Sequence, residues 1–92
     1  MDPTPLLDRI LDDEGITAGL DESETMAMLR VLSDRVRRIA GAANDPATAK
    51  RQVECLCREA RLIADEIAKL ESSESRAELL RRKLGDLNHR SV

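Results

Sequence analysis

Two cysteines, Cys55 and Cys57, are the residues of this chain with the most distinctive chemistry. A pair of thiolates can bind zinc or exchange with a disulfide, but a structural zinc site takes four ligands, and His89 is the only histidine in the sequence. Both cysteines fall on an expected helix, where side chains two positions apart point about 200° apart and cannot form a disulfide with each other. We therefore predict no metal and no cofactor, with Cys57 as a small core residue and Cys55 as a surface thiol.

Carboxylates are numerous, but their spacing does not indicate an active site. A di-metal site in a helical bundle needs a Glu-x-x-His motif on each of two helices, and a single histidine cannot supply both. Adjacent acids such as Asp65 and Glu66 diverge on a helix. No Ser/His/Asp set can be assembled, and the four glycines are isolated turn residues rather than a phosphate-binding loop. The sequence predicts that the protein is not an enzyme.

Basic side chains gather at residues 35–38 and again at residues 81–83. They would suit contact with phosphate groups or nucleic acid, but they also suit the closing turns of helices, where cations stabilise the helix dipole, and we prefer this second interpretation. The net charge of −3 and the absence of aromatic residues argue against binding to nucleic acid or to an anionic membrane. At four places an acid precedes a base by one helical turn, which supports the helix. These pairs are Asp34 with Arg38, Glu54 with Arg58, Asp65 with Lys69, and Glu78 with Arg82.

The elements that must position these side chains are read from apolar residues at helical spacing. A short stripe near the start predicts a short helix with Thr4 as its N-cap and Pro5 at its first position, which stops near Gly15. Residues 15–20 then form an ordered connector. Asp21 and Glu24 resemble a capping box, which predicts a second helix over about residues 22–40. Its a and d positions are Leu29, Leu32, Val36 and Ile39, and its e positions, which widen the stripe, are Met26, Ser33 and Ala40.

Asp45 followed by Pro46 is the strongest helix-start signal in the chain. The apolar stripe after it is unbroken to Leu70 and then loses phase at residues 72–73. Either a new helix starts there or one long helix continues over residues 46–90; two serines followed by Glu74 favour a new start. We expect residues 88–92 to fray. The third stripe is Ala49, Val53, Leu56, Ala60, Ile63, Ile67 and Leu70, and the fourth is Ala77, Leu80, Leu84 and Leu87.

Together these patterns predict an all-α fold, a small antiparallel helical bundle of three long helices plus a short N-terminal helix, in a single domain over residues 1–92. The core must come from aliphatic side chains and methionine, because the chain has no Phe, Tyr or Trp. No apolar run is long enough to span a membrane, and no signal-peptide pattern follows Met1, so we expect a cytoplasmic protein.

Two stretches resemble short all-helical bacterial proteins that have no assigned function. One is residues 6–22, LLDRILDDEGITAGLDE, and the other is the pattern Val-x-Cys-Leu-Cys-Arg-x-Ala-Arg at residues 53–61. The chain departs from those proteins in lacking their aromatic residues. The resemblance implies a helical fold and no activity.

The charge is unevenly divided, with a net of −7 over residues 1–34 and +4 over residues 35–92. Such halves can attract each other between copies. The short first helix also offers little apolar surface to cover the other stripes, so we expect a single copy to leave the C-terminal half of the third stripe exposed and a homodimer to form. The alternative is a closed, monomeric four-helix bundle. The predicted partner or dimer surface comprises Met28, Val31, Ile63, Ile67, Leu70 and Leu79.

We expect a non-enzymatic helical module for protein–protein interaction or structure. Such a module would associate with itself or bind another protein. The alternative is a small helical ligand-binding protein or enzyme in which arginines clamp an anionic metabolite. The outward heptad positions of Arg30, Arg37 and Arg38 disfavour that alternative.

Overall fold

The computed structural model describes residues 2–89, and 83% of them are helical. This value is far above the roughly one third that is usual for globular proteins, and no strand occurs within the described part, so the all-α prediction is confirmed. The five helices are α1 Thr4–Leu11, α2 Glu14–Thr17, α3 Glu22–Ala42, α4 Pro46–Ala68 and α5 Ser73–His89.

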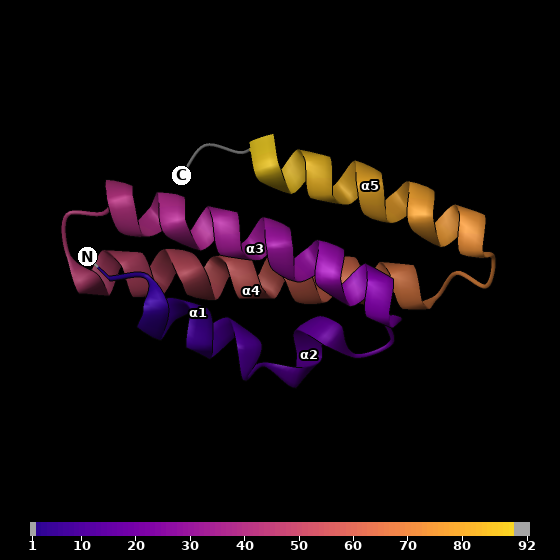
Figure 1. Ribbon diagram of the computed structural model, residues 1–92, viewed down its shortest axis with the longest axis horizontal. Helices are drawn as coiled ribbons and strands as arrows, with labels where there is room; N and C mark the ends of the chain where they lie inside the picture. The colour runs from indigo at the N-terminus through magenta and orange to yellow at the C-terminus, as the bar shows by residue number, and fades with distance from the viewer. Residues whose placement is uncertain (1, 90–92) are drawn as a thin grey trace.

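The helices form a narrow bundle of 42 × 24 × 17 Å (Figure 1). Helices α3 and α4 lie in the middle, α5 packs against both of them on one side, and α1 and α2 pack against them on the other. The three long helices run in alternating directions, so that α3 and α5 point the same way (Figure 1). Together, α1 and α2 act as a broken fourth helix.

Local capping starts both central helices where the sequence predicts. The Asp21 carboxylate accepts a hydrogen bond from the Glu24 backbone N–H at 2.7 Å, and the Glu24 carboxylate accepts one from the Asp21 backbone N–H at 2.9 Å. This is a complete capping box. At the start of α4, Asp45 accepts hydrogen bonds from both the backbone N–H and the hydroxyl of Thr48, each at 2.8 Å. The Thr48 backbone N–H is the main cause that lowers the pKa of Asp45.

The N-terminal segment differs from the prediction. Thr4 is the first residue of helix α1 rather than its N-cap, which is Pro3. Helix α1 ends at Leu11 rather than near Gly15, and part of the expected connector is the short helix α2. The reason is a local cap, because the Asp13 carboxylate accepts a hydrogen bond from the Gly15 backbone N–H at 2.9 Å and starts a new turn. The break allows Ile16 to be fully buried against the central pair. Gly19 then turns the chain with a φ of +80°, and a Cβ there would lie 2.7 Å from the Ala68 Cβ.

The question left open between one long helix and two is settled in favour of two. Helix α4 ends at Ala68, and α5 starts at Ser73. The Ser72 hydroxyl accepts a long hydrogen bond of 3.4 Å from the Ser75 backbone N–H, which is typical of a new helix start. Helix α5 extends to His89 and so includes two residues predicted to fray, while residues 90–92 of that prediction lie outside the described part.

The core matches the predicted stripe of α4, and it matches that of α3 at Leu32, Val36, Ile39 and Ala40 but not at its N-terminal end. On α4, all six predicted positions from Ala49 to Ile67 are buried, together with Cys57 and Ala64 beside them. On α3, the predicted e position Met26 is 62% exposed, whereas Met28 is completely buried. The reason is that α5 covers the opposite flank of α3, where Glu24 and Arg38 both bond to α5.

Candidate functional site

A densely bonded ion pair joins Glu24 on α3 and Arg76 on α5. The Arg76 guanidinium donates from Nη2 to Glu24 Oε1 at 2.6 Å and from Nε to Glu24 Oε2 at 2.9 Å. It also donates to the carbonyl oxygens of Ile67, Leu70 and Gly19, at 3.2, 3.2 and 2.7 Å. One side chain thus joins the start of α3, the end of α4 and the turn before α3.

This network holds its charges in place rather than leaving them available for chemistry. The hydrogen bonds from Arg76 are the main cause that lowers the pKa of Glu24, and burial opposes them. The same bonds raise the pKa of Arg76. Because Glu24 is buried and both of its oxygens are bonded, its carboxylate is a structural anion and not a general base.

A second charged cluster surrounds Cys57, between α1, α2 and α4. Arg9 bonds to Glu54 at 2.8 Å, and Arg61 bonds to Asp13. Arg61 is the main cause that lowers the pKa of Asp13. Burial raises the pKa of the Cys57 thiol, so this residue is protonated near neutral pH and is a poor nucleophile. Cys57 is buried and Cys55 exposed, as the sequence predicted, and no group of three metal-binding side chains comes together in the described part.

This difference predicts unequal reactivity of the two thiols. A disulfide reagent is expected to modify Cys55 at once, and Cys57 only when the bundle opens, because reaction needs an exposed thiolate. Stopped-flow labelling of the single variants Cys55→Ser and Cys57→Ser separates the two rates, and urea provides the fully reacted control. Fast labelling of Cys57 in folded Cys55→Ser would contradict the burial of that thiol.

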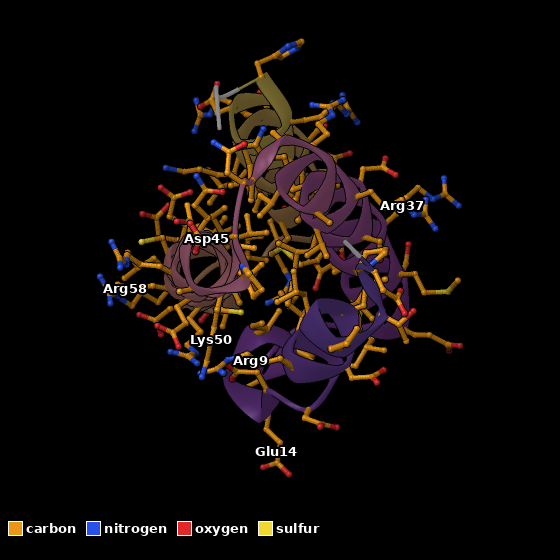
Figure 2. The ribbon with its side chains drawn as sticks, turned by 90° about the vertical axis from the view of Figure 1, so that its left-hand side faces the viewer. Arg9, Glu14, Arg37, Asp45, Lys50 and Arg58 are labelled. Atoms are coloured by element: carbon orange, nitrogen blue, oxygen red, sulfur yellow. The ribbon has the colours of Figure 1, made fainter. Side chains whose placement is uncertain are left out.

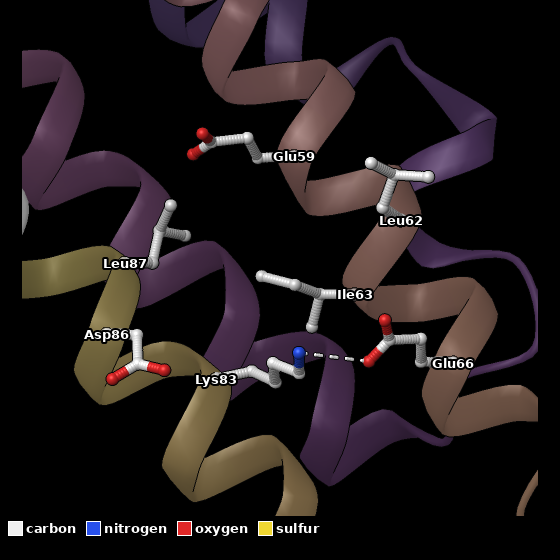
Figure 3. A pocket seen from close by; sticks show the side chains of 7 residues that line it. All are labelled: Glu59, Leu62, Ile63, Glu66, Lys83, Asp86 and Leu87. Carbon is white, nitrogen blue, oxygen red and sulfur yellow. Dashed lines mark ion pairs between the residues drawn. The ribbon is translucent and has the colours of Figure 1, made fainter.

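A groove of about 260 Å³ runs between α4 and α5 (Figure 3). Lys83 on α5 reaches across it to Glu66 on α4 at 3.2 Å, which closes one part of the groove. Leu62 stands at its edge with 61% of its surface exposed. The groove is lined by Glu59, Leu62, Ile63, Glu66, Lys83, Asp86 and Leu87. Its floor is apolar and its rim mainly acidic.

A larger hollow of about 390 Å³ lies between α3 and α5. It exists because Ala27 and Ala77 are too small to fill the space above the buried side chains of Leu80 and Leu84. Exposed Met26 stands beside it on α3. We call this region the α3–α5 surface, which comprises Glu22, Ser23, Met26, Ala27, Arg30, Ala77, Leu80, Arg81 and Leu84.

The two arginine clusters do not lie where the sequence analysis placed them. Helices α3 and α5 both extend beyond them, so neither cluster occupies a closing turn, and that interpretation is wrong. Arg38 instead donates to the Asn88 carbonyl oxygen at 3.0 Å, and Arg37 pairs with Asp34 at 3.6 Å. Figure 2 looks at the end of the bundle where α4 begins, and there Arg37 and Arg58 project outward on opposite sides. These two cations do not converge on a common site.

Of the four predicted acid–base pairs along helices, Asp65 with Lys69 is present at 3.6 Å. Two of the other acids have different partners: Asp34 pairs with Arg37, and Glu54 pairs with Arg9 across the bundle.

The predicted partner surface is mostly core. Met28 and Ile67 are fully buried within one chain and Ile63 is nearly so, which means that a single copy does not leave the third stripe exposed as predicted. Val31 and Leu79 are half-buried and pack against the core, and Leu70 is half-buried as well. The reason is that α2 and α5 both pack against α4, so its apolar stripe is enclosed within one chain.

The sequence analysis missed the exposure of Met26 and Leu62. A signal for Met26 was present, because the residues one turn before and after it, Glu22 and Arg30, are both charged. A residue between charges on the same helical face belongs to the solvent side. Leu62 carries the same signal, since Arg58 and Glu66 lie one turn before and one turn after it.

No described helix is both long enough and apolar enough to cross a membrane. Comparison with protein-family models, with curated proteins and with solved structures finds no match to this chain. A function therefore has to be argued from its own side chains.

Proposed function

We propose that this chain is a non-enzymatic protein–protein interaction module and that the α3–α5 surface is its contact face. The observation that carries the proposal is Met26, a large apolar side chain that is 62% exposed beside an apolar hollow. Exposed apolar side chains are common when scattered singly, but one next to a hollow with an apolar floor offers both a projection and a recess to a partner.

The chemistry of the neighbouring charges supports binding over catalysis. The ionisable groups at the end of the hollow, Glu24 and Arg76, are bonded to each other and to the backbone. The remaining charges beside it, such as Arg30 and Arg81, are exposed on its rim. An apolar centre with a polar rim is the usual composition of a protein interface.

The alternative function, binding of an anionic metabolite, finds its best support in the cluster around Cys57, where Arg9, Arg58 and Arg61 line a cavity of about 240 Å³. Arg9 and Arg61 already bond to Glu54 and Asp13 there. An anion would have to displace a carboxylate from each of them, so the interaction module is the better supported function.

Site-specific photo-cross-linking tests the proposal. A photoreactive amino acid is placed at position 26 or at position 62 of the full-length protein, in cells of the source organism. Leu62 on α4 is the matched control. It is an equally exposed apolar residue, but it lies at the groove between α4 and α5, away from the α3–α5 surface. We expect discrete protein adducts from position 26 and few from position 62. No adduct from position 26, or the same adducts from both positions, would contradict the α3–α5 surface as the contact face.

A further inference from the structure

Three residues on the outer face of α3 form a self-complementary stripe. Glu22, Met26 and Arg30 follow one another at intervals of four residues, so they lie along one face, each about 6 Å further along the helix axis. All three are exposed and line the same shallow depression. Within residues 2–89, neither Glu22 nor Arg30 takes part in an ion pair.

Helix α5 repeats this order of charges beside α3. The two helices run in the same direction (Figure 1), and the bonds between them join residues that are 50 or 52 positions apart. Arg81 follows Arg30 by 51 positions, and Glu74 follows Glu22 by 52, so each pair lies at one level of the bundle. Both helices therefore present acid at one level and base about two turns later, with the apolar hollow between them.

We propose that a second copy of this chain docks antiparallel on the α3–α5 surface, with the two-fold axis beside Met26. Glu22 of each copy then pairs with Arg30 of the other. This inference rests on the proposed function and identifies its partner. A two-fold axis requires the same patch on both copies, and Met26 is four residues from each charge, so the rotation exchanges acid with base.

The apolar part of the surface suits the same arrangement. In the antiparallel dimer, the Met26 side chains of the two copies pack against each other at the two-fold axis, beside the hollow that Ala27, Ala77 and Leu80 line in each copy. Methionine suits such a contact because its side chain is flexible and polarisable. A parallel arrangement would instead place like charges together at both levels. A partner of uniformly basic or uniformly acidic character would match only half of the stripe.

Sedimentation equilibrium of the purified protein measures the dimer directly. We expect a dimer for the unmodified chain and for Leu62→Asp, and a rise in the dissociation constant of about 30-fold or more for Met26→Asp, since it removes a central anchor of the interface. Both variants change exposed side chains, and circular dichroism checks that both stay folded. A monomer of 10.2 kDa that persists at hundreds of micromolar, or a dimer that tolerates Met26→Asp, overturns the inference.

Charge reversal tests the antiparallel register. Glu22→Arg alone and Arg30→Glu alone each place like charges together twice, so we expect each to weaken the homodimer by about three- to tenfold at low salt. An equimolar mixture of the two variants restores both attractive pairs in a heterodimer. Homodimers that are unaffected by either reversal, or a mixture that does not favour the heterodimer, overturn the register.

Failure of this inference can be told apart from failure of the proposed function. If the pure protein is a monomer while position 26 still gives adducts to a different protein in cells, the interaction module stands and the second copy is not its partner.

Discussion

Replacing Glu24 by alanine is expected to lower the free energy of unfolding by about 2–4 kcal/mol, because it leaves a mostly buried guanidinium without its counter-ion. In this variant Arg76 still bonds to three carbonyl oxygens and cannot simply move into water. A loss of this size lowers the thermal midpoint of a domain of 92 residues by about 10 °C or more. Urea denaturation at pH 7, followed by circular dichroism, measures the loss.

The same pair makes stability depend on pH. Arg76 holds the pKa of Glu24 below its ordinary value of 4.5, so the folded state favours the ionised carboxylate. The stabilisation is therefore present at pH values above 4.5 and is lost as the pH falls through the lower pKa of the folded state. We expect Glu24→Gln to reduce this loss between pH 5 and pH 2, compared with the unmodified chain.

Glu22→Ala, measured at protein concentrations at which the chain is a monomer, is the matched control, because it removes an exposed carboxylate from the same turn of α3. We expect Glu22→Ala to lower the free energy of unfolding by only a small fraction of the loss caused by Glu24→Ala. Arg76→Ala should lower the thermal midpoint in the same way as Glu24→Ala. The double variant should lower the free energy of unfolding by much less than the sum of the two single losses. Equal losses for Glu22→Ala and Glu24→Ala would show that the network adds nothing to stability.

The sequence predicted those parts of the fold that depend on neighbouring residues. Asp21 and Asp45 cap α3 and α4 as expected, since a cap needs only a side chain and the backbone two or three residues later. The stripe of α4 was also predicted correctly, because its apolar residues repeat without a break from Ala49 to Ile67 and all six of these positions are buried.

What the sequence did not predict depends on where α5 packs. Glu24 and Arg76 are 52 residues apart, and no local pattern links them. The same packing decides which flank of α3 is buried, and so exchanges the expected environments of Met26 and Met28. The candidate contact surface is a consequence of that exchange. Residues that a heptad pattern places inside can therefore form a surface when a third helix covers the other flank.

Met28→Ala and Met26→Ala test this placement of α3, and we expect opposite results from the same chemical change. Met28 is completely buried among the core side chains, so its truncation removes apolar contacts and leaves a cavity. Such truncations lower the free energy of unfolding by about 2–5 kcal/mol. Met26 is largely exposed in one copy, so its truncation is expected to change the stability of the monomer by less than about 0.5 kcal/mol.

The comparison must be made on the monomer, because a dimer that covers Met26 would add its own stability to the measurement. Urea denaturation at several low protein concentrations, extrapolated until the midpoint no longer changes, gives the monomer value. Met28→Leu is the volume-conserving control and is expected to cost less than about 1.5 kcal/mol. A loss of stability for Met26→Ala equal to or above that for Met28→Ala would place Met26 rather than Met28 in the core, with α5 on a different face of α3. Because α5 also supplies Ala77 and Leu80 to the hollow, that result would remove the α3–α5 surface as well.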